Sequence, residues 1–368
     1  MGGAGAVSIV LEAYGRCVPK STRQTRSREH VERICASGAD VGTLRVQLLE
    51  AMRGVVSFDA HAWLMTDPRT AVGSAPLADV PCLRELPRAI RLKYLTEVNR
   101  WTSLAQGGTP VGLLRRETGD DPTRSLMWRE LQSDYAVVDV ASAVFMDRFG
   151  CWGFLDLWRL NPAAAFDDSD AAFLSSVAAP ITTALRTSQS LTFAAPPPAA
   201  RDGLGPMVLL LDNDPQVQSQ TEATAEWLEV LLPASQGVQP IPAAAYNVAA
   251  QLLAVEHAVD DNPPSARVHL AGGLWVTLRA ARLIANSIAV TIEETTPADR
   301  LEMFCLCFGL SPREAEVLSH LATGGDTGEV AGRMYLSEHT VQDHLKSIFA
   351  KTSAHNHRNL LSRALGTR

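Results

Sequence analysis

Hydrophobic residues recur along the N-terminal half of the chain at two spacings, which predict helices alternating with strands. Helical spacing is found over 41–52, 83–94 and 167–187. Apolar and polar residues alternate, as in a half-buried strand, over 57–65, 137–145 and 152–160. The last two segments flank Asp147–Gly150, which predicts a β-hairpin turn. This order predicts an α+β unit with an antiparallel sheet.

A second, smaller α+β unit is predicted after residues 191–206, whose prolines, alanines and glycines indicate a linker. Alternating segments predict strands over 207–212, 266–270, 275–280 and 287–292, with Gly272 and Gly273 in a turn. Helices are predicted over 221–232 and 243–255. A phosphorylatable receiver domain is excluded here, because it needs a lysine to pair with the phosphoryl group and none lies between Lys93 and Lys346.

The C-terminal segment predicts four short helices. Ser311 and Glu314 form a capping box that begins the first helix, and two glycines at 324 and 325 end it. A second capping box begins at Asp326, and Ser337 caps the third helix. The fourth helix is predicted over 356–365.

The third of these helices has two different sides. Its apolar stripe consists of Val341, Leu345, Ile348 and Phe349. The opposite side carries Glu338, His339, Gln342, Asp343 and Lys346. A short helix, a tight turn and a helix with a polar outward side form a helix-turn-helix, whose second helix is shaped to enter the major groove of DNA.

Net charge changes this picture only in part. The 368 residues carry 33 Lys and Arg against 40 Asp and Glu, a net of −7, which argues against a nucleic-acid-binding protein. Residues 310–368, however, hold seven Lys or Arg and six Asp or Glu, a net of +1, so that −8 lies elsewhere. We therefore expect weak DNA affinity in a single copy.

Composition excludes several other classes. With 46% hydrophobic and 20% charged residues, the chain can form folded cores, and its length predicts two or three domains. No apolar run reaches the length of a membrane span, and the six scattered cysteines do not form a disulfide framework, so we expect a cytoplasmic protein without membrane association. Catalytic, metal-binding and phosphate-loop motifs are not found, so we expect no enzyme and no cofactor.

The C-terminal segment is similar, without gaps, to the LuxR-type DNA-binding domain. The matching positions are Leu310, Ser311, Arg313, Glu314, Glu316, Val317, Leu318, Ala322, Gly324, Glu329, Ala331, Leu336, Ser337, Thr340, Val341, His344, Leu345, Ile348 and Lys351. This resemblance implies promoter recognition by the third helix and dimer contacts through the fourth. It also implies a transcription regulator of the bacterial cytoplasm.

Side-chain chemistry gives candidate contacts within this domain. Gln342 suits adenine, Lys346 guanine and Asp343 cytosine, and His339 is a fourth candidate for base contact. Candidates for phosphate contact are Thr327, Thr340, Lys351 and Arg358. Candidates for dimer contacts are Leu360, Leu361 and Ala364. The sequence departs from the family at 326–328 and at His357, where cations are usual, which again indicates weak binding.

The two N-terminal units resemble sensor domains. Residues 29–190, through the segments FDAHAW and FGCWGFLDLWR and the order of elements, resemble a GAF-type domain, and residues 207–295 resemble a PAS-like domain. Candidate pocket residues are Trp63, Trp101, Trp128, Trp152 and Trp158, with packing in a core as the alternative. The sequence therefore predicts an α+β multidomain protein. Its parts are a basic extension at 1–28, a GAF-like α/β sensor, a small PAS-like domain and an all-α helix-turn-helix domain at 300–368.

The expected partners are double-stranded promoter DNA, a second copy of the chain, RNA polymerase and an unidentified small molecule. The alternative is a non-catalytic interaction or scaffold protein whose helix-turn-helix mainly forms dimers, which the weak basicity favours.

Overall fold

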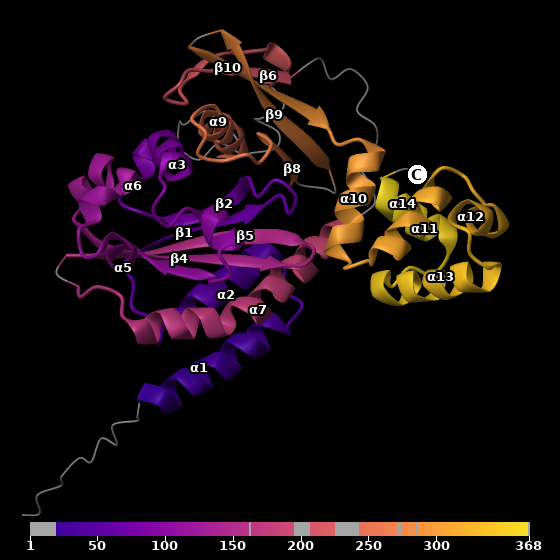
Figure 1. Cartoon of the computed structure of the whole chain (residues 1–368), viewed down its shortest axis with the longest axis horizontal. Helices are drawn as coiled ribbons and strands as arrows, with labels where there is room; N and C mark the ends of the chain where they lie inside the picture. Colours follow the sequence, from indigo (N-terminus) through magenta and orange to yellow (C-terminus); the bar gives the residue numbers. More distant parts are fainter. Residues whose placement is uncertain are drawn as a thin grey trace, which may run out of the picture.

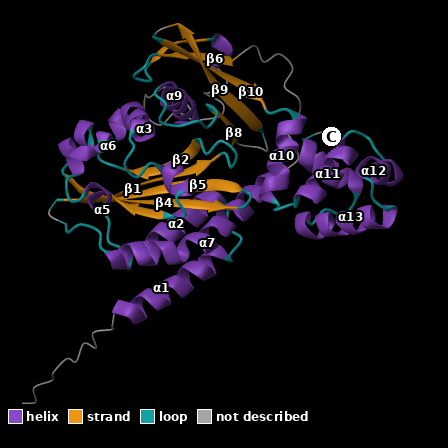
Figure 2. Ribbon diagram, in the orientation of Figure 1, coloured by secondary structure: helices purple, strands orange, loops and turns teal. Residues whose placement is uncertain are grey.

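The computed structural model describes residues 20–161, 163–194, 207–224, 243–270, 274–284 and 286–366. Two five-stranded antiparallel sheets lie one above the other with helices between and below them, and a group of helices at the C-terminal end lies to one side (Figures 1 and 2). This arrangement confirms the predicted α+β fold class with an all-helical C-terminal region.

The first sheet has the strand order β2-β1-β5-β4-β3. Its strands are β1 Ala60–Thr66, β2 Gly73–Asp79, β3 Val111–Leu113, β4 Val137–Asp147 and β5 Gly150–Leu160. The predicted hairpin is confirmed, since β4 and β5 pair antiparallel up to Asp147 and Gly150, with register shifts at Val137/Asp139 and Phe145/Met146. At Gly150 the φ angle is +138°, and a Cβ there would lie 2.3 Å from the carbonyl oxygen of Pro68, so only glycine fits this turn.

Helices cover both faces of the first sheet. On one face lie α2 Val41–Arg53 and α7 Asp168–Ser190, with α1 Lys20–Cys35 packed against them on the side away from the sheet, and on the other face lie α3 Leu86–Leu95 and α6 Leu126–Glu130 (Figure 1). Two further short helices are α4 Trp101–Gln106 and α5 Leu114–Thr118. Residues 20–28, which the sequence placed in an N-terminal extension, form the beginning of α1, and Gln24 Nε2 donates to Ser169 O of α7 at 3.4 Å.

The second sheet repeats the topology of the first. Its strands are β6 Met207–Leu211, β7 Val217–Gln220, β8 Ser265–His269, β9 Trp275–Ile284 and β10 Ser287–Glu294. They are ordered β7-β6-β10-β9-β8, which is the order of the first sheet when each sheet is numbered from its own first strand. The sheet is antiparallel, unlike that of a receiver domain. The predicted helix beyond residue 224 and the turn at Gly272 and Gly273 lie outside the described residues.

Helix α9, Ala243–Glu256, lies between the two sheets (Figure 1). Its sequence AAAYNVAAQLLAVE is apolar on nearly all sides, as expected for a helix buried all round. One side packs on β9 of its own sheet, and the other packs on α3 and β2 of the first sheet. The approach is close at Gly73, where a Cβ would lie 2.5 Å from Leu64 Cδ2 and 3.0 Å from Asn247 Oδ1.

Two buried ion pairs join the two α+β units. Arg267 of β8 binds Asp67, at the end of β1, through Nε at 2.8 Å and through a second nitrogen at 2.9 Å. Arg100 pairs with Asp260 at 2.5 Å, and both side chains are almost fully buried. Burial alone opposes the charge of Arg267, but its hydrogen bonds to Asp67 and the charges of Asp67 and Glu302 outweigh this and raise its pKa. The interface is therefore held by complementary charges as well as by apolar packing.

The C-terminal helices continue the core of the first unit. They are α10 Pro297–Cys307, α11 Pro312–Ala322, α12 Thr327–Met334, α13 Glu338–Thr352 and α14 His357–Leu365. Helix α10 begins at Pro297, directly after its N-cap Thr296, whose side chain accepts from the Asp299 N–H. One hydrophobic cluster extends from the first sheet through Phe193 and Phe304 to the helix-turn-helix.

We predict that Arg267→Met destabilises the protein by about 3–5 kcal/mol, because it leaves the carboxylate of Asp67 buried without its partner. The matched control is Arg69→Met, whose pair with Glu302 is exposed and should contribute less than about 1 kcal/mol. Urea unfolding followed by tryptophan fluorescence measures both. Equal losses in the two variants would contradict the role of the buried pair.

Candidate nucleic-acid interface

The helix-turn-helix is formed by α12 and α13 through local signals in the sequence. Asp326 accepts a hydrogen bond from the backbone N–H of Glu329 at 2.8 Å, and the Glu329 side chain returns to the Asp326 N–H, as the capping box predicts. Tyr335 ends α12 with a left-handed backbone (φ 55°), and Ser337 caps α13 by accepting from the Thr340 N–H at 3.1 Å. These caps fix where each helix begins and ends, which confirms the predicted helix boundaries.

One side of α13 anchors the motif. Val341, Leu345 and Ile348 are buried against α12 and α11. Residues of α11 and α12 that share this core are Val317, Leu318, Leu321, Val330, Ala331 and Met334. The predicted apolar stripe is therefore confirmed at these three positions, and Phe349 is half-buried beside it.

The opposite side of α13 brings the four candidate base-contacting residues together. His339, Gln342, Asp343 and Lys346 are all exposed. Lys346 Nζ lies 2.9 Å from Asp343 Oδ1, and His339 Nε2 lies 3.6 Å from Asp343 Oδ2. The hydrogen bond from Lys346 lowers the pKa of Asp343. Gln342 has no hydrogen-bond partner within the described chain, so its amide is free to bind.

The candidate phosphate-contacting residues are not equivalent. Lys351 Nζ lies 2.6 Å from Glu314 Oε2 and is used inside the domain, where it ties α13 to the start of α11. Thr340 is half-buried and shares a 2.8 Å hydrogen bond with Ser337. Thr327 is half-buried at the first turn of α12, and Arg358 is exposed at the start of α14. Of these four candidates, Arg358 is the one cation without an ion-pair partner in the described part of the chain.

Two exposed residues near α13 were missed by the sequence prediction. Arg333 of α12 is exposed and has no ion-pair partner in the described part of the chain. Tyr335 is 96% exposed in the turn between the two helices. An unpaired cation and a phenol beside the N-terminus of α13 have the chemistry of phosphate contacts. Helical spacing from the inward residues of α12 places Arg333 on the outside, which is the signal that could have found it.

The predicted dimer helix α14 is largely covered within its own chain. Leu360 and Ala364 are 0% exposed, and Leu361 is half-buried. Helix α10 packs along α14, and Arg363 Nε donates to the carbonyl oxygen of Phe193 at 3.3 Å. The side chains of Leu360 and Ala364 therefore belong to the core of the chain, which leaves Leu361 as the accessible member of the three.

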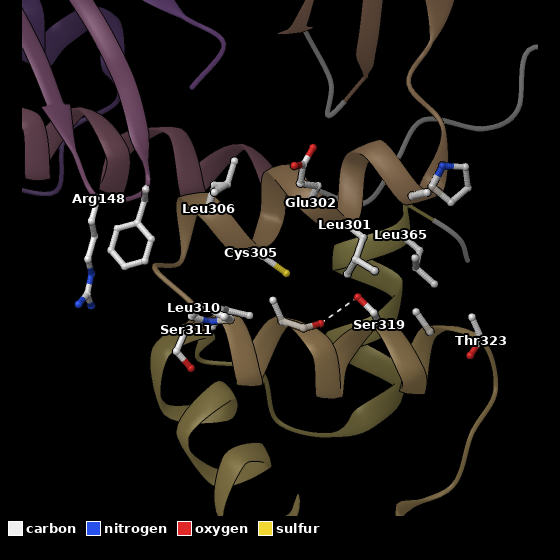
Figure 3. A pocket seen from close by; sticks show the side chains of 16 residues that line it. Arg148, Leu301, Glu302, Cys305, Leu306, Leu310, Ser311, Ser319, Thr323 and Leu365 are labelled. Carbon is white, nitrogen blue, oxygen red and sulfur yellow. Dashed lines mark hydrogen bonds between the residues drawn. The ribbon is translucent and has the colours of Figure 1, made fainter. Parts of the chain in front are cut away.

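A groove of about 740 Å³ separates α10 from α11 on one side of the C-terminal helices. In Figure 3, Leu301 and Cys305 of α10 point into it, and Ser319 of α11 faces them with its hydroxyl bound to Ala315 O at 2.8 Å. Its lining is mainly apolar. The groove marks the boundary between the helix-turn-helix and the helix that leads to it.

The five tryptophans named as candidate pocket residues do not surround one cavity. Trp63 and Trp152 pack in the core that includes α2 and α7. Trp101 and Trp158 line a small cavity on the other face of the first sheet, under α3 and α9. Trp128 is half-buried, and its Nε1 donates to a backbone carbonyl of β4 at 2.9 Å. Only two of the five thus share a cavity.

Some kinds of site are not found in the described residues. No group of three or more His, Cys, Asp or Glu side chains lies close enough to hold a metal ion. Of the helices in the described ranges, none combines the length and apolar character needed to cross a membrane.

Residues 309–364 match the family of bacterial regulatory proteins of the luxR type. This match confirms the predicted LuxR-type helix-turn-helix, and it is a family of regulators, not of enzymes. No curated protein matches the chain.

Three solved structures show distant similarity to this chain. Escherichia coli SdiA is 12% identical with a TM-score of 0.30, covering 93% of this chain and 98% of that one. SdiA in complex with octanoyl-rac-glycerol is 14% identical with a TM-score of 0.21, covering 95% and 93%. The E. coli DhaR(N)–DhaL complex is 12% identical with a TM-score of 0.23, covering 77% and 91%. Scores this low do not assign a fold to the N-terminal units.

We predict a pH-dependent contribution to stability from Glu314. Burial alone would raise its pKa, but hydrogen bonds from Lys351, Ser347 and Ser311 outweigh burial and lower the pKa to about 2, from 4.5. A lowered pKa stabilises the fold above pH about 4.5, and this contribution is lost as the pH falls towards 2. Glu314→Gln should therefore cost on the order of 1–2 kcal/mol near pH 7, since Lys351 is partly exposed, and almost nothing near pH 2.

Urea unfolding followed by circular dichroism at several pH values measures this difference. Glu316→Gln on the same helix is the matched control, because its pair with Arg313 is exposed. A loss from Glu314→Gln that stays constant with pH would show that shape, not charge, is responsible.

Proposed function

We propose that the chain is a LuxR-type transcription regulator of the bacterial cytoplasm that binds promoter DNA as a dimer through α12 and α13. The observation that carries the proposal is the outward side of α13, where Gln342, Asp343 and Lys346 stand exposed on a family-matched helix-turn-helix. These side chains have the donors and acceptors that distinguish base pairs in the major groove. Contacts to the phosphate backbone of the DNA come from Thr327, Thr340, Arg333 and Arg358. RNA polymerase is a further partner.

We further propose that residues 29–190 and 207–295 are sensor domains, joined by a linker at 191–206, that respond to a small molecule or partner. The shared strand order of the two sheets supports a common GAF- or PAS-like architecture. The continuous hydrophobic cluster from the first sheet to α13 supports mechanical coupling, because a tightly packed core transmits displacement. The domain at 300–368 is thus positioned by the sensor units.

The alternative function, an interaction protein whose helix-turn-helix mainly dimerises, is favoured by one observation. Both lysines of α13 are already paired, Lys346 with Asp343 and Lys351 with Glu314. The outward side of α13 therefore attracts phosphate only weakly at long range. A DNA-binding regulator should still bind duplex DNA in a salt-dependent way, whereas a protein that only dimerises should not.

We predict that Lys346→Met lowers the affinity for DNA selected from a random-sequence pool by about tenfold, since a base contact contributes about 1–3 kcal/mol. Gln342→Ala should have a similar effect and relax the preferred sequence. Arg313→Met is the matched control. Like Lys346 and Asp343, Arg313 and Glu316 on α11 form an exposed ion pair between residues three positions apart. Fluorescence anisotropy of the full chain with labelled duplex at two salt concentrations measures the affinities.

Two results would contradict the regulator proposal. One is the absence of any salt-dependent binding to duplex DNA by the parent protein. The other is an equal loss from Arg313→Met and Lys346→Met, which would mean that α13 has no special part in the contact.

We predict that Leu361→Lys weakens dimer formation without unfolding the chain, because this side chain of α14 is only half-buried. Leu360→Ala should instead destabilise the fold by about 2–5 kcal/mol, because its side chain is fully buried. Sedimentation equilibrium and thermal unfolding separate the two effects. An unchanged dimer in Leu361→Lys would place the dimer contact on another surface.

A further inference from the structure

The groove between α10 and α11 has an apolar body that follows the first helix of the DNA-binding domain. Its lining begins at Leu310 and Ser311, directly before α11, and ends at Ala322 and Thr323. It thus spans a helix of 11 residues, which is about 16 Å long. The volume of about 740 Å³ lies within the range of small-molecule sites, about 300–1,000 Å³. The groove therefore suits an elongated ligand that is mainly apolar.

The polar groups along the body of the groove are already satisfied or neutral. Ser319 Oγ donates to a backbone carbonyl of its own helix at 2.8 Å. Glu302, on the α10 side, pairs with Arg267 at 2.6 Å and with Arg69 at 3.0 Å, so its charge is compensated. Burial raises the pKa of the Cys305 thiol to about 12, so this side chain lines the groove as a neutral group. The body of the groove thus has no unpaired charge to hold or repel a ligand.

One end of the groove, in contrast, carries a cation. Arg148, in the turn between β4 and β5, lines the groove and is exposed. Its guanidinium lies over the ring of Phe149, 4.6 Å from the ring centroid, and it has no ion-pair partner in the described part of the chain. In Figure 3 this side chain lies at the end of the groove that Leu310 and Ser311 form. A guanidinium has the fork geometry that matches a carboxylate, so the end of the groove complements an anionic head group.

We propose that the groove binds a free, unbranched carboxylate of medium chain length, with its head group on Arg148 and its alkyl chain between α10 and α11. Burial of the methylene groups supplies the affinity, and the guanidinium sets the direction of the chain. The site lies outside the two sensor units and away from the exposed side of α13. The proposal names a ligand class for the regulator proposed above and rests on that function only for its consequence, which is to hold the helix-turn-helix at one angle to α10.

Isothermal titration calorimetry of the full chain without DNA tests the proposal on the parent protein. The probes are decanoate, octanoate and decyltrimethylammonium, each below the concentration at which it forms micelles. Decanoate should bind about fourfold to fifteenfold more tightly than octanoate, because two further methylenes leave water. Decyltrimethylammonium has the same alkyl chain and should bind about fivefold more weakly than decanoate, because Arg148 repels it.

A reversal of charge at Arg148 tests the position of the head group. Arg148→Glu should weaken decanoate about fivefold and strengthen decyltrimethylammonium. Arg53→Glu is the matched control, since Arg53 is also exposed, lies 4.5 Å over the ring of Phe58 and does not line the groove. It makes the same change in net charge and should leave both affinities unchanged.

A change at Ser319 tests the position of the alkyl chain. In Figure 3, Ser319 faces Leu301 and Cys305 across the groove, so the ring in Ser319→Phe should occupy the space of the chain and weaken decanoate by about tenfold or more. Ser319→Ala leaves the groove open and should bind as the parent does. Because Ser319 is exposed, both variants should keep the circular dichroism spectrum of the parent.

Four results would overturn the proposal: no binding of decanoate, equal binding of octanoate and decanoate, equal effects of Arg148→Glu and Arg53→Glu, or undiminished binding to folded Ser319→Phe. These titrations contain no DNA, so their failure leaves the DNA-binding function standing. A loss of DNA binding in Lys346→Met likewise says nothing about the groove.

Discussion

The buried guanidinium of Arg267 is the interaction on which the arrangement of the three parts depends. It lies in the second sheet, binds Asp67 of the first unit twice, and reaches Glu302 of α10 at 2.6 Å. A buried charge is tolerated only when each of its hydrogen bonds is satisfied. The first unit, the second sheet and α10 must therefore be packed together for Arg267 to keep its hydrogen bonds. This one side chain thus restricts the orientation of α10.

Helix α9 supplies the apolar half of the same constraint. Its residues are buried almost throughout, up to Ala254, so the second sheet cannot leave the first without exposing a mainly apolar helix. The ion pairs specify one arrangement, whereas the apolar faces of α9 alone would allow several. The two N-terminal units therefore behave as one body, and the cavity under α9 lies at the place where they meet.

The sequence predicted those parts whose signals are local. The capping boxes at Ser311 and Asp326 and the turn before Gly150 were found because each involves residues at most four positions apart. Strands β2, β3 and β7 were missed, since β2 contains proline and does not alternate, β3 has only three residues, and β7 is a run of four mainly polar residues. The strand order of both sheets required contacts that no local pattern records.

Site residues follow the same rule. The outward side of α13 could be predicted from helical spacing alone, and His339, Gln342, Asp343 and Lys346 do share it. Lys351 was predicted to contact phosphate. Its partner in the structure, Glu314, lies 37 residues away in the sequence, so no local pattern showed that this lysine is already paired. The tryptophans were grouped because they are large, although the two faces of a sheet separate them. Contacts between residues distant in the sequence thus decide which polar side chains remain available to bind a partner, and such contacts cannot be found from local patterns.

Under the proposed function, the outward side of α13 would meet DNA as an almost neutral surface. Since Lys346 is already paired with Asp343, a base pair would have to replace that partner and would gain little from long-range attraction. Two copies held at the spacing of two half-sites would compensate through the geometry of the pair. Within one chain, α10 packs on α14, and Arg267 holds α10 through Glu302. Under the proposed function, a signal that shifts the two N-terminal units would therefore act on the position of α14 in each copy, and not on the exposed side chains of α13.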